Sequence, residues 1–332
     1  MRRQHFLMIS TTLFAFLVIS CGPSERHGGA TEEGELPVTK VPNIGNAAEA
    51  YFSPDGRSLI CNAKREGDEG FHTYTLRKNG TRIRRINELG EDACSYYFPS
   101  NKQLIYTSTR DNLHLPPGNW SDPENYPNGA ELYSCDLKGG DLKRLTFNEY
   151  YEAEASLSPD EEWILFGRQI DGKMDLWRMR PDGSDEYQIT HTPDWQEGGS
   201  FYMRDSETIL FRAWKITDEG QRGMPMTIFT IKHDGTDLRQ ITQDPGTNWA
   251  PYPAPDGKHF AFVKVLPPHN YEIYMMNIET GEQTRLTHSD AFDGFPSISP
   301  DGNTLCFSSS RETPPGERWL TLYLMDISSL GI

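Results

Sequence analysis

The chain has 332 residues, of which 36% are hydrophobic and 24% are charged. This composition supplies enough apolar residues for a buried core and excludes the disordered and collagen-like classes. The 32 Lys and Arg against 48 Asp and Glu give a formal charge of -16, which argues against a nucleic-acid-binding protein because phosphate contacts require a basic face. With 29 Gly, 23 Pro and no sustained helical period, a helix bundle is also disfavoured.

The first 20 residues have the composition of a secretory signal peptide. A basic start at residues 1–3 precedes an apolar stretch at residues 6–19, which is too short to span a bilayer as a stable anchor. The stretch is followed by Ser20 and Cys21, and this ending resembles the bacterial lipoprotein cleavage box. The resemblance implies that Cys21 becomes the new, lipidated N-terminus; the alternative is an ordinary secretory signal followed by an incidental Cys. Gly22 favours the outer membrane by resemblance to the enterobacterial sorting rule.

After the signal, residues 21–35 are interpreted as the lipidated Cys and a flexible tether, because they are small or charged and lack periodicity. From residue 36 to residue 332 the chain is repetitive. Six segments share one pattern, as in EAYFSPDGRSLICNA from Glu49 and FPSISPDGNTLCFSS from Phe295. The reference residues of the six segments are Pro54, Pro99, Pro159, Arg204, Pro255 and Pro300. Their spacings of 45, 60, 45, 51 and 45 residues indicate one repeat with insertions at residues 109–130 and 215–226.

Each repeat also has a second half that consists of an apolar strand, a Gly-containing turn and a short strand, as in LYSCDLKGGDLKRLT from Leu132. Four short strands repeated six times predict an all-β fold, a six-bladed β-propeller of four-stranded antiparallel blades. The blades are expected to start near residues 46, 91, 151, 196, 247 and 292. The sixth blade lacks a fourth strand, and residues 36–42 have the length and alternation to supply it. We therefore predict that this N-terminal strand closes the ring as an outer strand, where Pro37 is tolerated.

The repeat motifs are specific enough to suggest a family. The Ser-Pro-Asp-Gly turn, the Leu-Tyr-x-Met-Asp strand and the closing Arg-x-Leu-Thr resemble the repeats of TolB-type β-propellers, and they cover about residues 36–327. The resemblance implies a propeller domain of the bacterial cell envelope, in the form of a stand-alone lipoprotein.

Three of the four Cys after Cys21 are expected to be free thiols. In the repeat register, Cys61, Cys135 and Cys306 occupy positions that hold Phe, Met, Ile or Leu in the other repeats. Buried thiols that behave as small hydrophobic side chains are therefore favoured over disulfides. For Cys94, at the start of an inner strand, the place in the repeat does not distinguish a free thiol from a disulfide.

The candidate binding residues lie where the inner strands begin, on the face that also carries both insertions. Seven residues before the reference positions, five blades have a carboxylate or an amide, which predicts an acidic ring at the mouth of the central channel. The predicted binding residues are Asp92, Glu152, Glu197, Asn248 and Asp293 with Tyr151, Trp195 and Trp249 at the channel mouth, and Trp120 and Tyr126 in the first insertion. The alternative is that the carboxylates cap loop amides in every blade, and that the aromatic residues pack between blades.

A basic residue follows each second strand and is expected to pair with the acidic ring or with a neighbouring blade, or to be solvated at the surface. These residues are Arg65, Arg110, Arg168, Arg212, Lys264 and Arg311. No His-x-His or His-Glu-x-x-His pattern is present, so no metal ligand or catalytic residue is assigned. No cofactor is expected either, although the channel offers a place for a cation.

These features predict a non-catalytic binding platform, a monomeric propeller that captures an envelope protein or peptide on its loop-rich face. It would contact the membrane only through its lipid, facing the periplasm from the outer membrane, and it would not bind nucleic acid. The alternative is an envelope carbohydrate-active enzyme, a lyase or hydrolase, in which carboxylates on the same face act as acid and base. A Ser hydrolase is disfavoured because the chain has no Gly-x-Ser-x-Gly motif.

Overall fold

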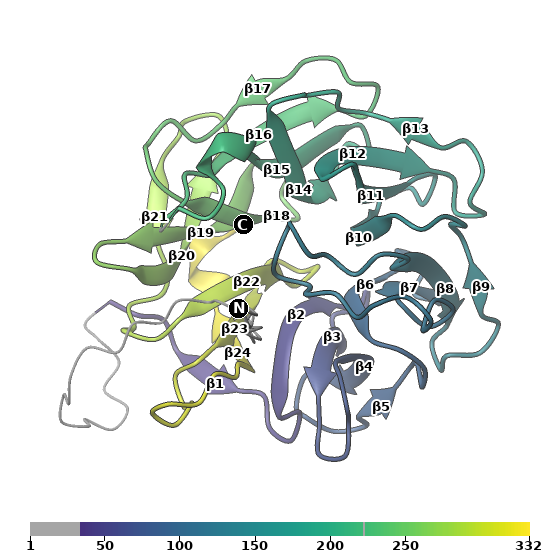
Figure 1. Cartoon of the computed structure of the whole chain (residues 1–332). Coiled ribbons are helices and arrows are strands. Elements are labelled where there is room, and N and C mark those ends of the chain that lie inside the picture. The colour runs from purple at the N-terminus through teal and green to yellow at the C-terminus, as the bar shows by residue number, and fades with distance from the viewer. Residues whose placement is uncertain (1–33, 222) are drawn as a thin grey trace, which may run out of the picture.

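The structure is a computed structural model that describes residues 34–221 and 223–332. The predicted signal peptide and Cys21 lie outside these residues. Six four-stranded sheets, the blades, surround a central channel (Figure 1). Blade 1 comprises β2 (Asn46–Phe52), β3 (Ser58–Lys64), β4 (His72–Arg77) and β5 (Arg84–Arg85). Blade 2 comprises β6 (Asp92–Tyr97), β7 (Gln103–Ser108), β8 (Glu131–Asp136) and β9 (Lys143–Arg144). Blade 3 comprises β10 (Tyr151–Leu157), β11 (Ile164–Ile170), β12 (Lys173–Met179) and β13 (Tyr187–Gln188).

The second half of the ring repeats this order. Blades 4 and 5 comprise β14 (Trp195–Tyr202), β15 (Thr208–Lys215), β16 (Thr227–Lys232) and β17 (Arg239–Gln240); and β18 (Asn248–Pro253), β19 (His259–Leu266), β20 (Asn270–Asn277) and β21 (Gln283–Arg285). Blade 6 comprises β22 (Asp293–Ile298), β23 (Thr304–Ser309), β24 (Thr321–Asp326) and the N-terminal β1 (Val38–Lys40). All strand pairs within the blades are antiparallel, and the predicted six-bladed all-β fold is confirmed.

The ring is closed by the N-terminal strand, as the sequence predicts. β1 pairs with β24 in the register Val38 with Met325 and Lys40 with Tyr323. Figure 1 shows the two strands side by side, β1 in purple and β24 in yellow. Because the first and last segments of the chain share one sheet, the sixth blade is complete only when both are in place.

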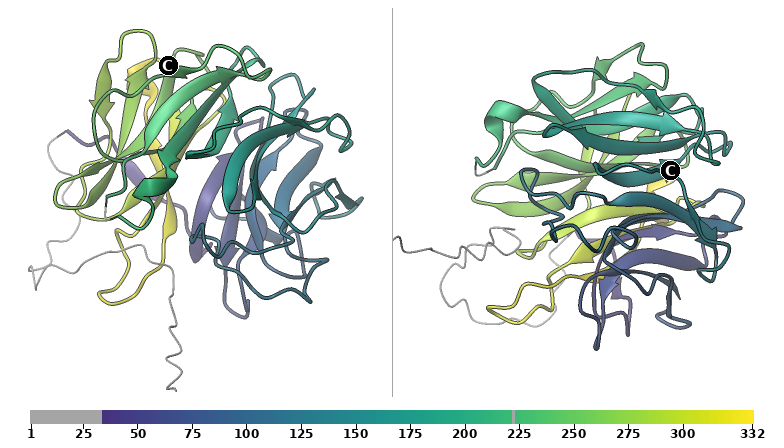
Figure 2. Two further views of the ribbon diagram at one scale, coloured as in Figure 1. Left: turned by 45° about the horizontal axis from the view of Figure 1, so that its top comes forward. Right: turned by 45° about the vertical axis from the view of Figure 1, so that its right-hand side comes forward.

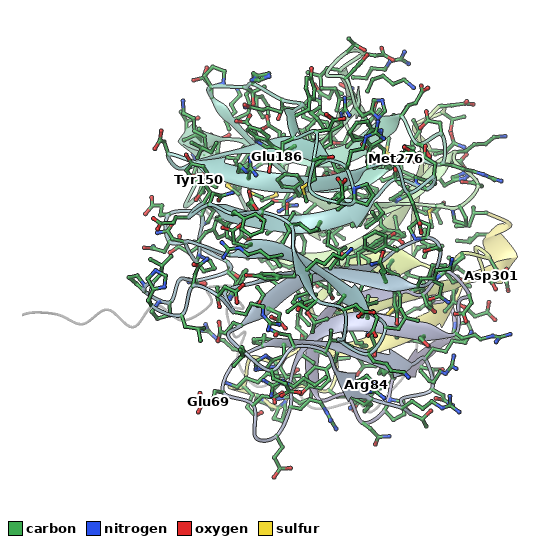
Figure 3. All side chains as sticks on the ribbon, turned by 90° about the vertical axis from the view of Figure 1, so that its right-hand side faces the viewer. Glu69, Arg84, Tyr150, Glu186, Met276 and Asp301 are labelled. Atoms are coloured by element: carbon green, nitrogen blue, oxygen red, sulfur yellow. The ribbon has the colours of Figure 1, made fainter. Side chains whose placement is uncertain are left out.

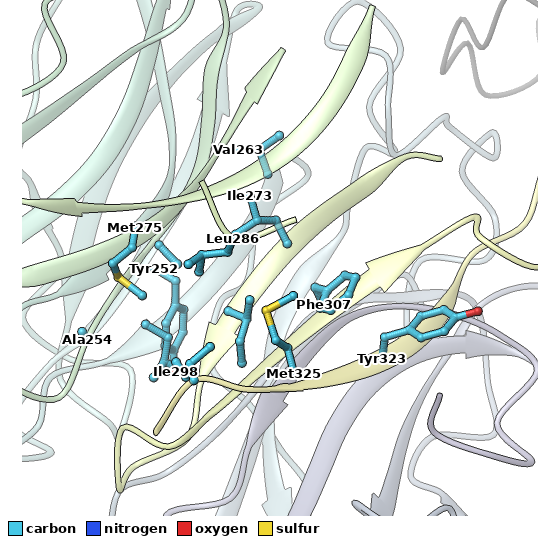
Figure 4. Packing of buried hydrophobic residues seen from close by; sticks show 13 residues of the cluster. Tyr252, Ala254, Val263, Ile273, Met275, Leu286, Ile298, Phe307, Tyr323 and Met325 are labelled. Atoms are coloured by element: carbon cyan, nitrogen blue, oxygen red, sulfur yellow. The ribbon is translucent and has the colours of Figure 1, made fainter. Parts of the chain in front are cut away.

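The hydrophobic core consists of layers between neighbouring blades. The second strands are buried along most of their length, whereas most residues of the outer strands are partly or fully exposed. Figure 4 shows the layer between blades 5 and 6, in which Tyr252, Val263 and Ile273 face Phe307 and Met325. Comparable layers lie between the other pairs of neighbouring blades. Each blade therefore needs both of its neighbours to bury its apolar faces.

The ring has two different faces. The Asp-Gly turns lie on one face, and the second-to-third strand loops lie on the opposite, loop-bearing face. In a side view, Glu69 and Tyr150 project from the loop-bearing face and Asp301 from the turn face (Figure 3). The first insertion follows β7, and the second contains the short 3-10 helix η1 (Ile216–Asp218) after β15. A second 3-10 helix, η2 (Ser328–Leu330), follows β24. Figure 2 shows the ring in two tilted views.

The described part of the chain contains four free thiols, and three of them, Cys61, Cys135 and Cys306, are buried, as expected. Cys94 is partly exposed and is also free. Over residues 34–221 and 223–332, no helix is long and apolar enough to cross a membrane.

Candidate binding site in the central channel

The five polar residues predicted at the channel mouth are buried at the starts of the inner strands. They are Asp92, Glu152, Glu197, Asn248 and Asp293, and none is more than 2% exposed. Each bonds to the loop or strand beside it. Asp92, for example, accepts hydrogen bonds from the backbone of Thr73 at 2.9 Å and the amide of Asn87 at 2.6 Å, and Glu197 accepts from Thr192. The structure thus places these side chains under the loops, where the four carboxylates accept from backbone or side-chain donors and Asn248 donates to backbone carbonyls. Their role in binding stays a prediction.

Two of the predicted basic residues pair with this set. Arg168 contacts Glu152 and also Glu186, and Arg311 contacts Asp293 at 2.6 Å. Arg311 additionally binds Glu35 at 2.5 Å, which attaches the segment before β1 to blade 6. The expectation of pairing is therefore met at these two positions, and both pairs are largely buried.

The first insertion folds back over blade 3. The ring of Tyr126 stacks on Tyr151 at 4.1 Å, and Trp120 meets the same Tyr151 ring edge-on at 6.0 Å. The indole of Trp120 donates to Glu91 at 3.0 Å. Three predicted aromatic residues are thus brought together beside the channel. The other two lie apart from them, Trp195 against Phe229 in blade 4 and Trp249 against Phe295 between blades 5 and 6.

Four aromatic side chains contact one another across the channel below this level, and we call them the aromatic plug. They are Tyr51, Tyr96, Phe201 and Tyr252, one from each of blades 1, 2, 4 and 5. Their ring centroids lie 4.9 to 6.0 Å apart in five contacts, and the hydroxyls of Tyr96 and Tyr252 are 3.1 Å apart. Blades 3 and 6 have Ser156 and Ser297 at this position. The repeat alignment could have revealed the plug, because all six residues lie three before the reference residues.

Every inner strand contains a β-bulge just above the plug. The bulge is marked by a register shift in each pairing of a first with a second strand. One residue in each bulge has a positive φ, and together these six form what we call the bulge belt: Glu49, Cys94, Glu154, Gly199, Ala250 and Phe295. Only Gly adopts this backbone region without cost. Blades 1 to 4 therefore present an acid, a thiol, a second acid and a Gly in succession.

Glu154 bridges blades 3 and 4. It accepts a hydrogen bond from the backbone N–H of Gly199 at 2.5 Å and one from Arg212 at 2.8 Å. The Arg212 guanidinium lies where a side chain on Gly199 would stand, since a Cβ there would be 2.1 Å from Nη1. A side chain at position 199 would therefore require the guanidinium to shift. The Glu154 side chain is 20% exposed, so the belt can be reached by solvent.

Glu49 has neutral hydrogen-bond partners. The Asn62 amide donates to it at 2.9 Å, and Cys94 of the next blade donates through its backbone and its thiol. Burial and the nearby Glu154 carboxylate raise the pKa of Glu49 to about 7. Burial and the two carboxylates also raise the pKa of Cys94 well above its usual range, so its thiol stays protonated and is a poor nucleophile.

A surface pocket of about 400 Å³ opens on the same face, over blade 3. Both insertions contribute to it: Glu124 from the first and Glu219 from the second. Its lining residues are Pro123, Glu124, Asn128, Tyr150, Gln169, Asp171, Gly172 and Glu219. Glu219 is held by Gln196 at 2.6 Å and by the indole of Trp214 at 3.0 Å. The pocket lining is acidic and contains no Lys or Arg.

In the described residues, no group of three or more His, Cys, Asp or Glu side chains is arranged to hold a metal ion. Sequence reasoning missed Glu49 and Glu154, because the belt position holds five different residue types in the six blades. One local signal of the belt is Gly199, because four of the other five blades have a side chain larger than Ala at the same position.

Comparisons with known proteins agree with this architecture. A family model described as the TolB beta propeller domain matches residues 221–329. An uncharacterized protein of Agrobacterium fabrum is 25% identical over 222 residues, which cover 65% of this chain and 69% of that protein. A TolB homolog of Chlorobium luteolum is 28% identical over 160 residues, 47% of this chain. The match spans only 33% of that relative's own length.

Two solved structures show the same fold. A putative TolB from Agrobacterium tumefaciens has a TM-score of 0.58 and 18% identity, over 87% of this chain and 96% of that one. An oligogalacturonate lyase from Vibrio parahaemolyticus has a TM-score of 0.57 and 14% identity, over 90% and 96%. At these identities the likeness shows the fold alone. The six four-stranded blades show a β-propeller, and the matching family model and the TolB relatives support a propeller of the TolB-like type.

Proposed function

We propose that the protein is a non-catalytic binding platform of the bacterial cell envelope, anchored through lipidated Cys21, which captures a protein or peptide on its loop-bearing face. The observation that carries the proposal is the convergence of both insertions on one acidic pocket beside the channel. Tyr150, which is 42% exposed at the edge of this pocket, and Phe147, which is 77% exposed in the same loop, supply apolar contact area. A basic, partly apolar segment is the complementary partner.

The test is a crosslinking capture of partners from envelope extract with three forms of the mature protein. The pocket variant carries Tyr150→Ala and Asp171→Asn. The control variant carries Tyr187→Ala and Asp182→Asn, which remove a Tyr of equal exposure, 42%, and an equal charge away from the pocket. We expect a partner that the unaltered and control proteins capture and the pocket variant loses. If the pocket variant melts normally and keeps every partner, the pocket is not the binding surface.

A second candidate function, a carbohydrate-active enzyme, is favoured by the two channel carboxylates Glu49 and Glu154. They have different hydrogen-bond partners, and burial raises the pKa of Glu49 to about 7, into the range of a general acid or base at neutral pH. The solved lyase of the same fold suggests oligogalacturonate as a first substrate to assay. Formation of an unsaturated product that Glu49→Gln abolishes would establish this function in place of the binding platform.

A further inference from the structure

The segment before β1 is fixed to the loop-bearing face of the ring. Glu35 accepts hydrogen bonds from the Arg311 guanidinium at 2.5 and 3.1 Å and from the backbone N–H of His288 at 3.3 Å. Arg311 follows β23 and His288 follows β21, so both lie in loops on this face. The same guanidinium contacts Asp293 at 2.6 Å, and the Glu35 side chain is 3% exposed. We call this arrangement the Glu35 clamp.

The clamp determines where the chain that carries the predicted anchor leaves the ring. Thirteen residues separate Cys21 from Glu35, and a chain of this length spans at most about 50 Å when fully extended. The inner strands have six to eight residues, so the ring is roughly 20 to 26 Å high without its loops. To bring the turn face to the membrane, the tether would first have to pass this whole height. The shortest path to the membrane therefore starts at the loop-bearing face.

The same face carries exposed apolar side chains next to the acidic pocket. Leu113 lies in the first insertion, and Phe147 and Tyr150 lie in the loop after β9; all three are exposed. Cζ of Arg144 lies 5.0 Å from the centre of the Phe147 ring, and its Nη1 lies 3.9 Å from Asp111, which joins this loop to the insertion. Tyr150 also lines the pocket. Negative charge and apolar contact area are thus combined on the face from which the tether departs.

We propose that the anchored protein turns its loop-bearing face toward the membrane that carries its lipid, and that the pocket binds a basic, partly apolar segment of a second protein attached to the same membrane. The gap between this face and the membrane is limited by the reach of the tether. Segments of membrane-attached proteins are concentrated in this gap, whereas a soluble globular protein would have to enter it. Positive charge on the segment complements a pocket lined by Glu124, Asp171 and Glu219.

This inference rests on the proposed function, whose partner it specifies, but the orientation can be tested without a partner. Cys21 of the mature protein is coupled to a thiol-reactive lipid in phosphatidylcholine vesicles, which have no net charge to attract or repel an acidic face. Cys94→Ser removes the partly exposed thiol of the described residues and keeps a donor in its place. Natural lipidation of Cys21 is not needed for this experiment.

Orientation is measured by energy transfer to an acceptor lipid. An amino acid that carries a fluorescent donor replaces Leu113 on the loop-bearing face or Leu238 in the turn between β16 and β17, two positions that are 60% and 56% exposed. Because the height of the ring separates the two faces, transfer should be at least about twofold stronger from position 113. Equal transfer, or stronger transfer from position 238, would overturn the proposal.

A longer tether is the control for the clamp. Inserting about 20 Gly and Ser residues before Gly34 leaves the clamp intact and adds about 65 Å of reach. The difference between the two donor positions should then shrink. A difference that persists unchanged would mean that the face itself adheres to lipid, and would overturn the argument from the clamp.

The partner is tested with the peptide Lys-Lys-Trp-Lys-Lys-Trp attached to a lipid. Crosslinking to the anchored protein is compared between vesicles that carry both molecules and mixtures of vesicles that carry one each. We expect at least about tenfold more crosslinking when both share a vesicle. The pocket variant with Tyr150→Ala and Asp171→Asn should lose this signal, and the control variant with Tyr187→Ala and Asp182→Asn should keep it. A peptide with Glu in place of Lys should not be captured.

The outcomes distinguish this inference from the proposed function. Equal crosslinking to peptide on separate vesicles would show that the pocket faces away from its own membrane, and would overturn the inference. A soluble partner that only the pocket variant loses from envelope extract would also overturn it, while the proposed function would stand. The proposed function fails if the folded pocket variant keeps every partner, whichever face is turned toward the membrane.

Discussion

At the scale of single residues, Gly199 shows how one missing side chain permits an ion pair between blades. Its φ is 56°, and a Cβ would lie 2.1 Å from Nη1 of Arg212. We expect Gly199→Ala to lower the free energy of unfolding by roughly 2 to 3 kcal/mol, about 1 kcal/mol from the strained backbone and the rest from displacing a buried guanidinium from Glu154. Chemical denaturation measures this difference.

The matched control is Gly172→Ala. Gly172 has a φ of 76°, but no atom lies within 4 Å of the place that its Cβ would take. This variant should therefore show only the backbone cost of roughly 1 kcal/mol. Equal losses in the two variants would mean that the Arg212 contact with Glu154 contributes nothing measurable.

The candidate site was predictable only in part, and the bulge explains why. In a regular strand side chains alternate between faces, so the position of a residue predicts its direction. A bulge adds one residue and breaks this alternation between Ala48 and Tyr51 in blade 1, and at the same place in every blade. The sequence located Asp92 and Glu197 at the correct ends of their strands. Because the sequence did not reveal the bulges, it could not indicate that Glu49 and Glu154 also line the channel.

At the scale of elements, the predictions from the repeats succeed because each blade must provide the same four strands. The repeat spacing located the insertions, and the missing fourth strand of blade 6 identified β1. The clamp that holds the segment before β1 was not predictable, because Glu35 lies in the predicted tether. In the structure, Arg311 joins Glu35 to Asp293, and these two carboxylates are 3% and 0% exposed.

We expect Arg311→Met to be severely destabilising. It leaves Glu35 and Asp293 buried without a cation, a change that typically costs about 3 kcal/mol or more. Lys40→Met is the control in β1 itself, because Lys40 pairs with Glu312 at an exposed position and its loss should change stability by less than about 1 kcal/mol. Urea unfolding of both variants measures the difference. Similar small effects would show that the Glu35 clamp does not secure the closing strand.

At the scale of the whole molecule, the ring encloses carboxylates in all parts of its circumference, and this determines its response to pH. Burial is the main cause that raises the pKa of Asp92 to about 6, of Glu49 and Glu272 to about 7, and of Glu197 to about 8. The usual pKa of such groups is about 4. Each of them therefore favours the folded state when protonated, and its contribution is lost as the pH rises from about 4 through 6 to 8.

We therefore expect the melting temperature to fall by several degrees between pH 5 and pH 8. Below pH 4 a carboxylate with a lowered pKa has the opposite effect. Partial burial would raise the pKa of Asp205, but hydrogen bonds from Thr208, Glu207 and the Lys232 ammonium outweigh it and hold this pKa at about 2. The stability that ionised Asp205 contributes is therefore lost on acidification. Stability should thus be greatest near pH 4 to 5. Calorimetry at constant ionic strength measures the profile.

Two comparisons separate the buried carboxylates from general repulsion in a chain of formal charge -16. Repulsion between surface charges is screened by 0.5 M NaCl, whereas the cost of ionising a buried group is not. Glu197→Gln keeps an acceptor for Thr192 but cannot ionise, so it should reduce the fall in melting temperature between pH 6 and pH 8. Glu124→Gln, at the exposed pocket, should leave the profile unchanged. A fall that disappears in salt, or that Glu197→Gln does not reduce, would mean that surface repulsion and not the enclosed carboxylates controls the stability of the ring.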